Sequence, residues 1–316
     1  MVKRIKMGIS SCLLGEKVRY DGQHKLDHYL KNVLGHHVQW VGVCPEVECG
    51  LPIPREAMHL IGDSNSPRLV TVRTNIDHTD RMENWINQKL KKLEQYDLSG
   101  FVFKSKSPSS GLKNVKIYQD NGIPVKNGMG LFAKAFTEKF PYVPVEEEGR
   151  LHDAKLRENF LEQVFVYKRW QDYIADDNTF AGLELFHRRH KYLLITHSEG
   201  GFLELDDIVH QGRHMPLSEV QDKYLHKLMY TMSIHTSTTK NASVMHEIMD
   251  TFNQMLSHDE KLELVDQIDV YQKGYAPLIV PVVLLQHYVR KYNLSDLSEQ
   301  YYLFQYPNEL CLRNRV

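Results

Sequence analysis

Two patterns of hydrophobic and polar positions divide the chain. Up to about residue 143, short apolar runs alternate with polar helical stretches, which is typical of an α/β domain with a largely parallel sheet. Beyond that point apolar residues recur every three or four positions, as in Leu156, Phe160 and Val164, and this spacing predicts helices. We therefore expect a Rossmann-like α/β domain over residues 1–143, followed by a mostly α-helical domain over residues 144–316.

Three apolar runs in the first part, at residues 5–9, 38–43 and 100–103, have the length and composition of strands. Each leads directly into an unusual polar motif; the motifs are Ser10-Ser11-Cys12, Cys44-Pro45-Glu46 and Lys104-Ser105-Lys106-Ser107-Pro108. Ligands of open α/β sheets bind outside the carboxyl ends of the strands. We therefore expect the three motifs to meet in one crevice.

A stretch rich in proline and acidic residues, 140–149, contains helix breakers and a run of three glutamates. Such a stretch interrupts both helix and strand patterns, and its charges favour contact with water. We therefore predict that it is the linker between the two domains.

Composition and charge limit the classes of function. The chain has 316 residues, and 39 Lys and Arg against 40 Asp and Glu give a net charge of −1, so contact with nucleic acid requires a local basic patch. Four cysteines are too few for a disulfide framework in a chain of this length. The longest apolar stretch, residues 276–285, is far short of the ~20 residues that a membrane span needs. We expect a cytoplasmic protein with no membrane role.

Each polar motif has an ordinary interpretation when taken alone. Cys12 is then a small buried residue, and Glu46 forms an ion pair with Arg55. The serine-rich loop is either a polar surface loop or a set of hydroxyl and ammonium groups offered to an anion. The motifs acquire a more specific meaning only as a set.

As a set, the motifs resemble the bacterial thiouracil desulfidase family, TudS, over residues 5 to about 140. The matching segments are Ser-Cys-Leu-Leu-Gly, Arg-Tyr-Asp-Gly, Cys-Pro-Glu-Val, Gly-Leu-Pro-Ile-Pro-Arg and Lys-Ser-Lys-Ser-Pro-Ser. The family carries a 4Fe-4S cluster on three cysteines. Carried over by position, two of these ligands are Cys12 and Cys44, and the third falls on position 110, immediately before Gly111. Here that residue is Ser110.

The resemblance implies a non-redox desulfuration. The iron without a protein ligand would bind the sulfur of a thiolated pyrimidine, and water would attack the carbon. Glu46 matches the family's carboxylate and is the candidate general acid/base, while Ser107 would position the substrate or assist proton transfer. A hydroxyl is a poorer iron ligand than a thiolate, so two possibilities stay open: no stable cluster forms on this chain, or Cys49 replaces the missing ligand.

The second part resembles the YbgA-like domain over roughly residues 180–316. The resemblance rests on the segment 186–194, Phe-His-Arg-Arg-His-Lys-Tyr-Leu-Leu, and on the terminal segment 306–316. Proteins that join both domains resemble the desulfidases that remove sulfur from 4-thiouridine in tRNA, which implies tRNA as the partner. The basic cluster His187-Arg188-Arg189-His190-Lys191, which Lys168, Arg169, Arg290 and Lys291 could extend, is either an RNA contact or a solvated helix face.

Three hypotheses of different classes follow. The first is an iron–sulfur-dependent tRNA 4-thiouridine desulfidase, impaired or cluster-poor because of Ser110. The second is a cluster-free protein that binds thiolated tRNA without chemistry. The third is a thiol redox sensor that uses Cys44 and Cys49, which requires their Cα atoms to lie within about 7 Å of each other. For the helical histidines His187, His190 and His197, a structural or RNA-facing role is favoured over metal binding.

Overall fold

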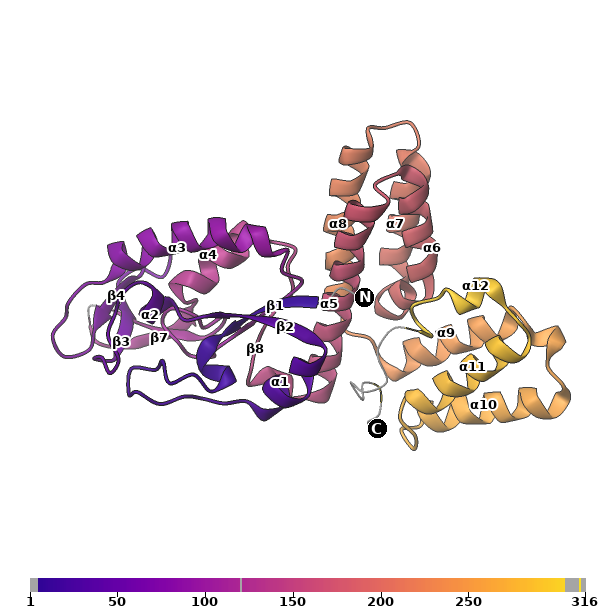
Figure 1. The fold of residues 1–316 in the computed structure, drawn as a ribbon. Helices are drawn as coiled ribbons and strands as arrows, with labels where there is room; N and C mark the ends of the chain where they lie inside the picture. The colour runs from indigo at the N-terminus through magenta and orange to yellow at the C-terminus, as the bar shows by residue number, and fades with distance from the viewer. Residues whose placement is uncertain (1–4, 120, 305–312, 314–316) are drawn as a thin grey trace. The chain divides into compact units, whose positions relative to one another are not determined.

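The computed structural model describes residues 5–119, 121–304 and 313. The chain divides into two compact units, Met1–Phe160 and Leu161–Val316, and each is described here by itself (Figure 1). The first unit contains two β-sheets with helices, and the second consists of helices. This confirms the predicted fold class, an α/β domain followed by a mostly helical one.

Sheet A carries the three predicted strands. Its strands are β1 (Ile5–Ser10), β2 (Val38–Val43), β5 (Phe101–Phe103) and β8 (Val145–Glu147). Their order is β2-β1-β5-β8, and every neighbouring pair is parallel. Ser10 pairs with Val43 at the ends of β1 and β2, so the carboxyl ends of these strands lie at one edge of the sheet.

Strand β8 lies within the stretch that the sequence predicts as a linker. It pairs with β5, and its last residue, Glu147, is buried. The Glu147 carboxylate accepts hydrogen bonds from the backbone N–H groups of Leu112 at 2.8 Å and Lys113 at 3.3 Å. The acidic stretch is therefore part of the sheet domain. Its buried charge is tolerated because backbone N–H groups distant in the sequence donate hydrogen bonds to the carboxylate.

Sheet B was not expected from the sequence. Its strands are β3 (Met58–Ile61), β4 (Arg68–Thr71), β6 (Val115–Tyr118) and β7 (Pro124–Gly128), in the order β4-β3-β6-β7. Strand β3 pairs with β6 in parallel, and the two outer pairs are antiparallel.

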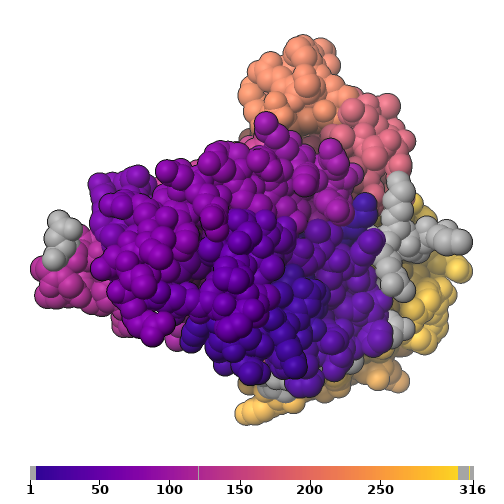
Figure 2. Space-filling model, turned by 60° about the vertical axis from the view of Figure 1, so that its left-hand side comes forward, coloured from indigo at the N-terminus to yellow at the C-terminus, as the bar shows by residue number. Residues whose placement is uncertain are grey.

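Two amphipathic helices cover one face of sheet A (Figure 1). Helix α3 (Thr79–Leu93) buries Met82, Ile86, Leu90 and Leu93, which lie on the apolar stripe visible in the sequence. Helix α4 (Leu131–Lys139) places Phe132 and Phe136 against the two phenylalanines of β5, with ring centroids 4.8–5.9 Å apart. The short helices of this unit are α1 (His28–Asn32), α2 (Pro45–Glu48), η1 (Ser11–Leu14), η2 (Leu34–His36), η3 (Glu94–Tyr96) and η4 (Arg150–His152). In the space-filling view, early segments of the chain in indigo and later ones in purple form one continuous surface of this unit (Figure 2).

The second unit is built from helices. They are α5 (Ala154–Asp176), which begins in the first unit, α6 (Phe180–His197), α7 (Glu199–Gly212), α8 (Leu217–Ser233), α9 (Thr238–Asp250), η5 (Asn253–Met255), α10 (His258–Gln272), α11 (Ile279–Lys291) and α12 (Ser295–Ser298). Side chains of Thr179, Ser198, Ser237 and Ser257 cap four of them by accepting a hydrogen bond from a first-turn amide. Over the described ranges of the chain, no helix is long and apolar enough to cross a membrane.

Candidate functional site

The carboxyl ends of β1, β2 and β5 open onto one cavity of about 380 Å³. Strand β1 leads into η1, β2 leads into α2, and β5 leads into residues 104–110, which we call the serine loop. The Ser10 hydroxyl accepts a hydrogen bond from the backbone N–H of Lys104 at 2.9 Å and so joins two of these ends. The expectation that the three motifs meet is confirmed, because all three contribute to the lining.

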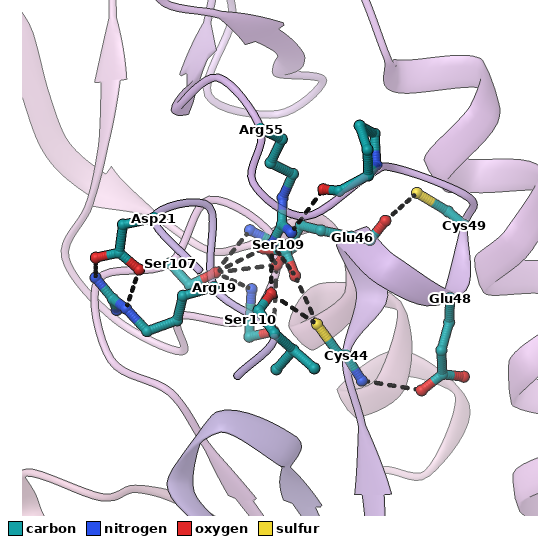
Figure 3. Close-up of polar contacts among 12 residues, drawn as sticks. Arg19, Asp21, Cys44, Glu46, Glu48, Cys49, Arg55, Ser107, Ser109 and Ser110 are labelled. Atoms are coloured by element: carbon teal, nitrogen blue, oxygen red, sulfur yellow. Dashed lines mark hydrogen bonds and ion pairs between the residues drawn. The ribbon is translucent and has the colours of Figure 1, made fainter. Parts of the chain in front are cut away.

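All five candidate residues named from the sequence line this cavity. They are Cys12, Cys44, Glu46, Ser107 and Ser110. Cys49 does not: its Sγ donates to the backbone oxygen of Glu46 at 3.2 Å, on a different side of α2 from Cys44 (Figure 3). Cys44 and Cys49 are both free thiols with different partners.

The carboxylate of Glu46 is held by groups from three parts of the chain (Figure 3). Its Oε1 accepts a hydrogen bond from the Ser109 hydroxyl at 2.6 Å, and the Ser107 hydroxyl lies 3.5 Å away. Its Oε2 lies 3.9 Å from Arg55 Nη2 and 3.7 Å from Cys44 Sγ. The ion pair with Arg55 therefore exists, but its contact is longer than the bond to Ser109. These contacts fix the carboxylate beside the thiol of Cys44.

Ser109 is a site residue that sequence reasoning missed. Its side chain is completely buried, and it makes the shortest hydrogen bond that Glu46 accepts from a described residue. The available signal was its place two residues after Ser107 in the same motif. Sequence alone does not show which of three nearby serines faces the carboxylate.

The shape of the serine loop depends on Ser107 and on a glycine outside the motif. The Ser107 hydroxyl accepts hydrogen bonds from the backbone N–H groups of Ser109 at 3.3 Å and Ser110 at 3.2 Å. Gly130, just before α4, packs against the same two residues: a Cβ at this position would lie 2.4 Å from the backbone carbon of Ser109. Ser107 thus builds the turn that presents Ser109 and Ser110 to the cavity.

Burial keeps both cavity thiols protonated near neutral pH. Desolvation raises the pKa of Cys12 from 9.0 to about 11. Desolvation, together with the charge of Glu46, raises the pKa of Cys44 to about 12. A metal bound by these sulfurs would have to displace two protons, so its affinity would increase with pH.

Basic side chains outnumber acidic ones around the cavity. The lining contains Arg19, Lys25, Arg55, Lys104 and Lys106 against the single acid Glu46. Arg19 is paired with Asp21 at 3.3 Å and Lys104 with Glu148. Lys25 and Lys106 are exposed, and neither has an acidic partner in the described part of the chain. The cavity therefore favours an anionic ligand.

Comparison with known proteins agrees with the two-part organisation. Residues 7–148 match the family described as 2-thiouracil desulfurase. Residues 191–307 match DUF1722, a family described as a protein of unknown function. The chain joins a 2-thiouracil desulfurase domain to a DUF1722 domain.

Individual relatives match each part of this fusion. YbgA of Escherichia coli K12, an uncharacterized protein, is 25% identical over 132 residues, which are 41% of this chain and 77% of YbgA. YbbK of Bacillus subtilis 168, also uncharacterized, is 27% identical over 108 residues, which are 33% of this chain and 71% of YbbK. The solved structure of the [4Fe-4S]-dependent thiouracil desulfidase TudS is 29% identical, with a TM-score of 0.39, and the match covers 48% of this chain and 95% of that protein.

The three residues that the family resemblance assigns to a cluster all line the cavity, but one of them offers a hydroxyl in place of a thiolate. Iron–sulfur clusters are held by thiolates, and a neutral hydroxyl is a much poorer ligand for iron. Cys12 and Cys44 supply two thiols to the cavity, and Ser110 supplies a hydroxyl. Cys49 does not replace the third thiol in this structure, because its sulfur lies elsewhere. Among the residues that the structure describes, no three His, Cys, Asp or Glu side chains are arranged to hold a metal ion.

The predicted basic cluster, residues 187–191 of helix α6, is not one surface patch. Its two histidines are buried, at 7% and 0% exposure. Arg188 and Arg189 lie 3.5 and 3.3 Å from the carboxylate of Glu299, and Lys191 pairs with Glu247 at 2.9 Å. The sequence shows a run of charge but not that the helix buries two of its members and pairs the rest.

Three of the four residues proposed to extend that cluster are also engaged, and the fourth, Arg290, is exposed. Lys168 pairs with Asp172, Lys291 pairs with Glu260, and the Arg169 guanidinium lies 3.8 Å from the ring centroid of Tyr301. The terminal motif, residues 306–316, lies outside the described residues except for Arg313.

The three helical histidines have separate partners. His187 contacts Tyr224 Oη at 3.0 Å and Asp206 Oδ1 at 3.2 Å. His190 Nδ1 donates to the carbonyl of Phe186 at 2.7 Å, and His197 Nδ1 donates to that of Ile234 at 2.6 Å. Each ring is held in the helical core by its own hydrogen bonds, in agreement with a structural role.

Proposed function

We propose that this chain is an iron–sulfur-dependent desulfidase that removes sulfur from 4-thiouridine in tRNA, impaired because Ser110 stands where the third cluster cysteine is expected. The net reaction is a hydrolysis: water replaces the thiocarbonyl sulfur by oxygen, and the sulfur leaves as hydrogen sulfide. The observation that carries the proposal is the convergence of Cys12, Cys44, Glu46 and Ser110 in the cavity of a 2-thiouracil desulfurase domain.

Glu46 is the proposed acid/base residue. Its Oε1 is held by Ser109, while its Oε2 has only contacts of 3.7 Å or longer to the described residues. This second oxygen is the one placed to accept a proton from water or a ring nitrogen and to return it to the departing sulfur. Ser107 supports this step as a positioning residue, since its hydroxyl oxygen accepts hydrogen bonds from two backbone N–H groups of the serine loop.

The proposed substrate is a polynucleotide rather than a free base. The exposed ammonium groups of Lys25 and Lys106 at the cavity suit phosphates that flank a base. In this proposal the first unit, up to residue 160, carries the chemistry, and the helical unit from residue 161 holds the tRNA. A cytoplasmic location stays a prediction from the sequence.

Ser110 favours a second candidate function. Without a third thiolate, the same cavity could bind thiolated tRNA with no cluster and no chemistry. This alternative predicts tRNA binding that weakens with salt, no iron in the purified protein, and little effect of Glu46→Gln on affinity.

One comparison separates the two functions. The natural chain and its Ser110→Cys variant are purified anaerobically with iron and sulfide, and both are assayed for bound iron, charge-transfer absorption and sulfide release from thiolated tRNA. Cys49→Ser is the matched control, because it changes a cysteine outside the cavity. We expect the iron content and sulfide release of Ser110→Cys to exceed those of the natural chain, and Cys49→Ser to match the natural chain. Binding of tRNA without iron or sulfide release in either protein would favour the second function.

A further inference from the structure

Arg55 is a buried cation at the cavity whose hydrogen-bonding capacity is only partly used. Its side chain is 8% exposed and lines the cavity. Nη2 donates to the carbonyl of Val18 at 3.1 Å, and Nη1 approaches that of Pro52 at 3.4 Å. Nε is buried and has no hydrogen-bond partner among the described residues. Each Nη group carries two N–H bonds, and the described residues give each of them one carbonyl partner, so the guanidinium keeps N–H groups that a ligand in the cavity can use.

The position of Arg55 defines the order of groups that a ligand meets. Glu46 Oε2 lies 3.9 Å from the guanidinium and 3.7 Å from Cys44 Sγ, so the carboxylate stands between donor and thiol (Figure 3). The wall of the cavity therefore presents a hydrogen-bond donor, Arg55, then an acceptor, Glu46, and then the thiol of Cys44.

This order is complementary to one edge of a thiolated uracil. Along that edge the base carries a carbonyl oxygen, the N3–H group and the thiocarbonyl sulfur. The carbonyl accepts hydrogen bonds and N3–H donates one, which matches Arg55 followed by Glu46. The same order occurs in 2-thiouracil and 4-thiouracil, so the match concerns the class of base.

We propose that Arg55 determines the specificity for thiolated uracil by donating a hydrogen bond to the carbonyl oxygen beside N3, while Glu46 Oε2 accepts a hydrogen bond from N3–H. The inference rests on the proposed function, because it takes a thiolated pyrimidine as the ligand. It adds a recognition residue that neither the family match nor the sequence motifs assign.

Two small probes test this role through equilibrium binding. One is 4-thiouracil, and the other is pyrimidine-4-thione, which keeps the sulfur and N3–H but lacks the carbonyl oxygen. Affinities are measured by calorimetry for the natural chain and for Arg55→Gln. A hydrogen bond to a charged donor corresponds to roughly ten- to hundred-fold in affinity. We expect the natural chain to prefer 4-thiouracil by that factor, and Arg55→Gln to lose the preference while retaining affinity for pyrimidine-4-thione.

A matched variant removes the general effect of charge. Arg19→Gln removes the same charge from the cavity lining, and we expect it to keep the preference for 4-thiouracil. Equal loss of affinity for both probes in Arg55→Gln, or loss of the preference in Arg19→Gln, would overturn the assignment. The result is independent of turnover: selective binding without sulfide release would leave Arg55 assigned and refute the desulfidase. If the chain releases sulfide but Arg55→Gln keeps the preference for 4-thiouracil, the desulfidase stands and the role of Arg55 is refuted.

Discussion

The hydrogen bond between Ser109 and Glu46 should be the main interaction that fixes the proposed acid/base residue. It measures 2.6 Å, and the Ser109 side chain is completely buried, so water cannot reach the carboxylate from that side without rearrangement. Hydrogen bonds to charged groups contribute about 1.5–3 kcal/mol. We expect Ser109→Ala to lower the free energy of unfolding by an amount in that range.

A double-mutant cycle isolates this interaction. Urea unfolding is followed by tryptophan fluorescence, in which Trp40 and Trp85 report on the first unit, for Ser109→Ala, Glu46→Ala and the double variant. We expect a coupling energy of at least about 1.5 kcal/mol. Ser105→Ala is the control: its hydroxyl donates to Glu148 at 2.9 Å and shares no partner with Glu46 among the described residues, so its coupling to Glu46 should be below about 0.5 kcal/mol. Equal coupling for the two serines would refute the argument.

Three further predictions concern thiol reactivity, packing and acid stability. At pH 8, iodoacetamide should alkylate Cys12 and Cys44 of the metal-free chain about 100-fold or more slowly than a cysteine of pKa 9.0, because burial raises their pKa values to about 11 and about 12; mass spectrometry of the labelled peptides measures this. Gly130→Ala should lower the free energy of unfolding by about 1–3 kcal/mol in urea titrations, because its Cβ would meet loop backbone at 2.4 Å. Burial lowers the pKa values of His187 and His190 below 6.5. As the pH drops below that value, the unfolded chain therefore binds protons that the folded chain does not, and the free energy of unfolding of the helical unit should decrease. Urea unfolding at pH 7.5 and 5.5 tests this. If His190→Gln loses as much free energy of unfolding between these two pH values as the unsubstituted chain does, the prediction is wrong for His190.

The parts of the fold that sequence predicted are those encoded by local pattern. The apolar runs at 5–9 and 38–43 became β1 and β2 almost residue for residue, because turn-forming residues bound them. The stripe from Met82 to Leu93 became the buried face of α3. Convergence at the cavity then followed from the parallel arrangement of the strands, which brings their carboxyl ends to one edge.

The parts that escaped prediction depend on partners distant in the sequence. Strands β3 and β7 carry polar residues and only four or five positions each, so their pattern is weak. Glu147 belongs to an acidic run, and its burial depends on amides 34 and 35 residues away. His190 lies in a basic run, yet the helix turns it into the core. In the sequence, the charge of these segments predicted exposure to solvent. In the structure, hydrogen bonds to distant residues offset the free-energy cost of burying the polar side chains.

The Ser110 side chain is separable from the network that holds Glu46. Its hydroxyl has one side-chain contact among the described residues, to the Ser109 hydroxyl at 3.3 Å, whereas the bond from Ser109 to Glu46 does not pass through it. Because position 110 lines the cavity, the larger sulfur of a cysteine has open space beside it. Ser110→Cys should therefore leave the serine loop and the carboxylate in place and change only the donor atom offered to iron. We expect the cysteine variant to unfold at the same urea concentration as the natural chain but to differ from it in iron content. That result would show that the donor atom at position 110 causes the difference.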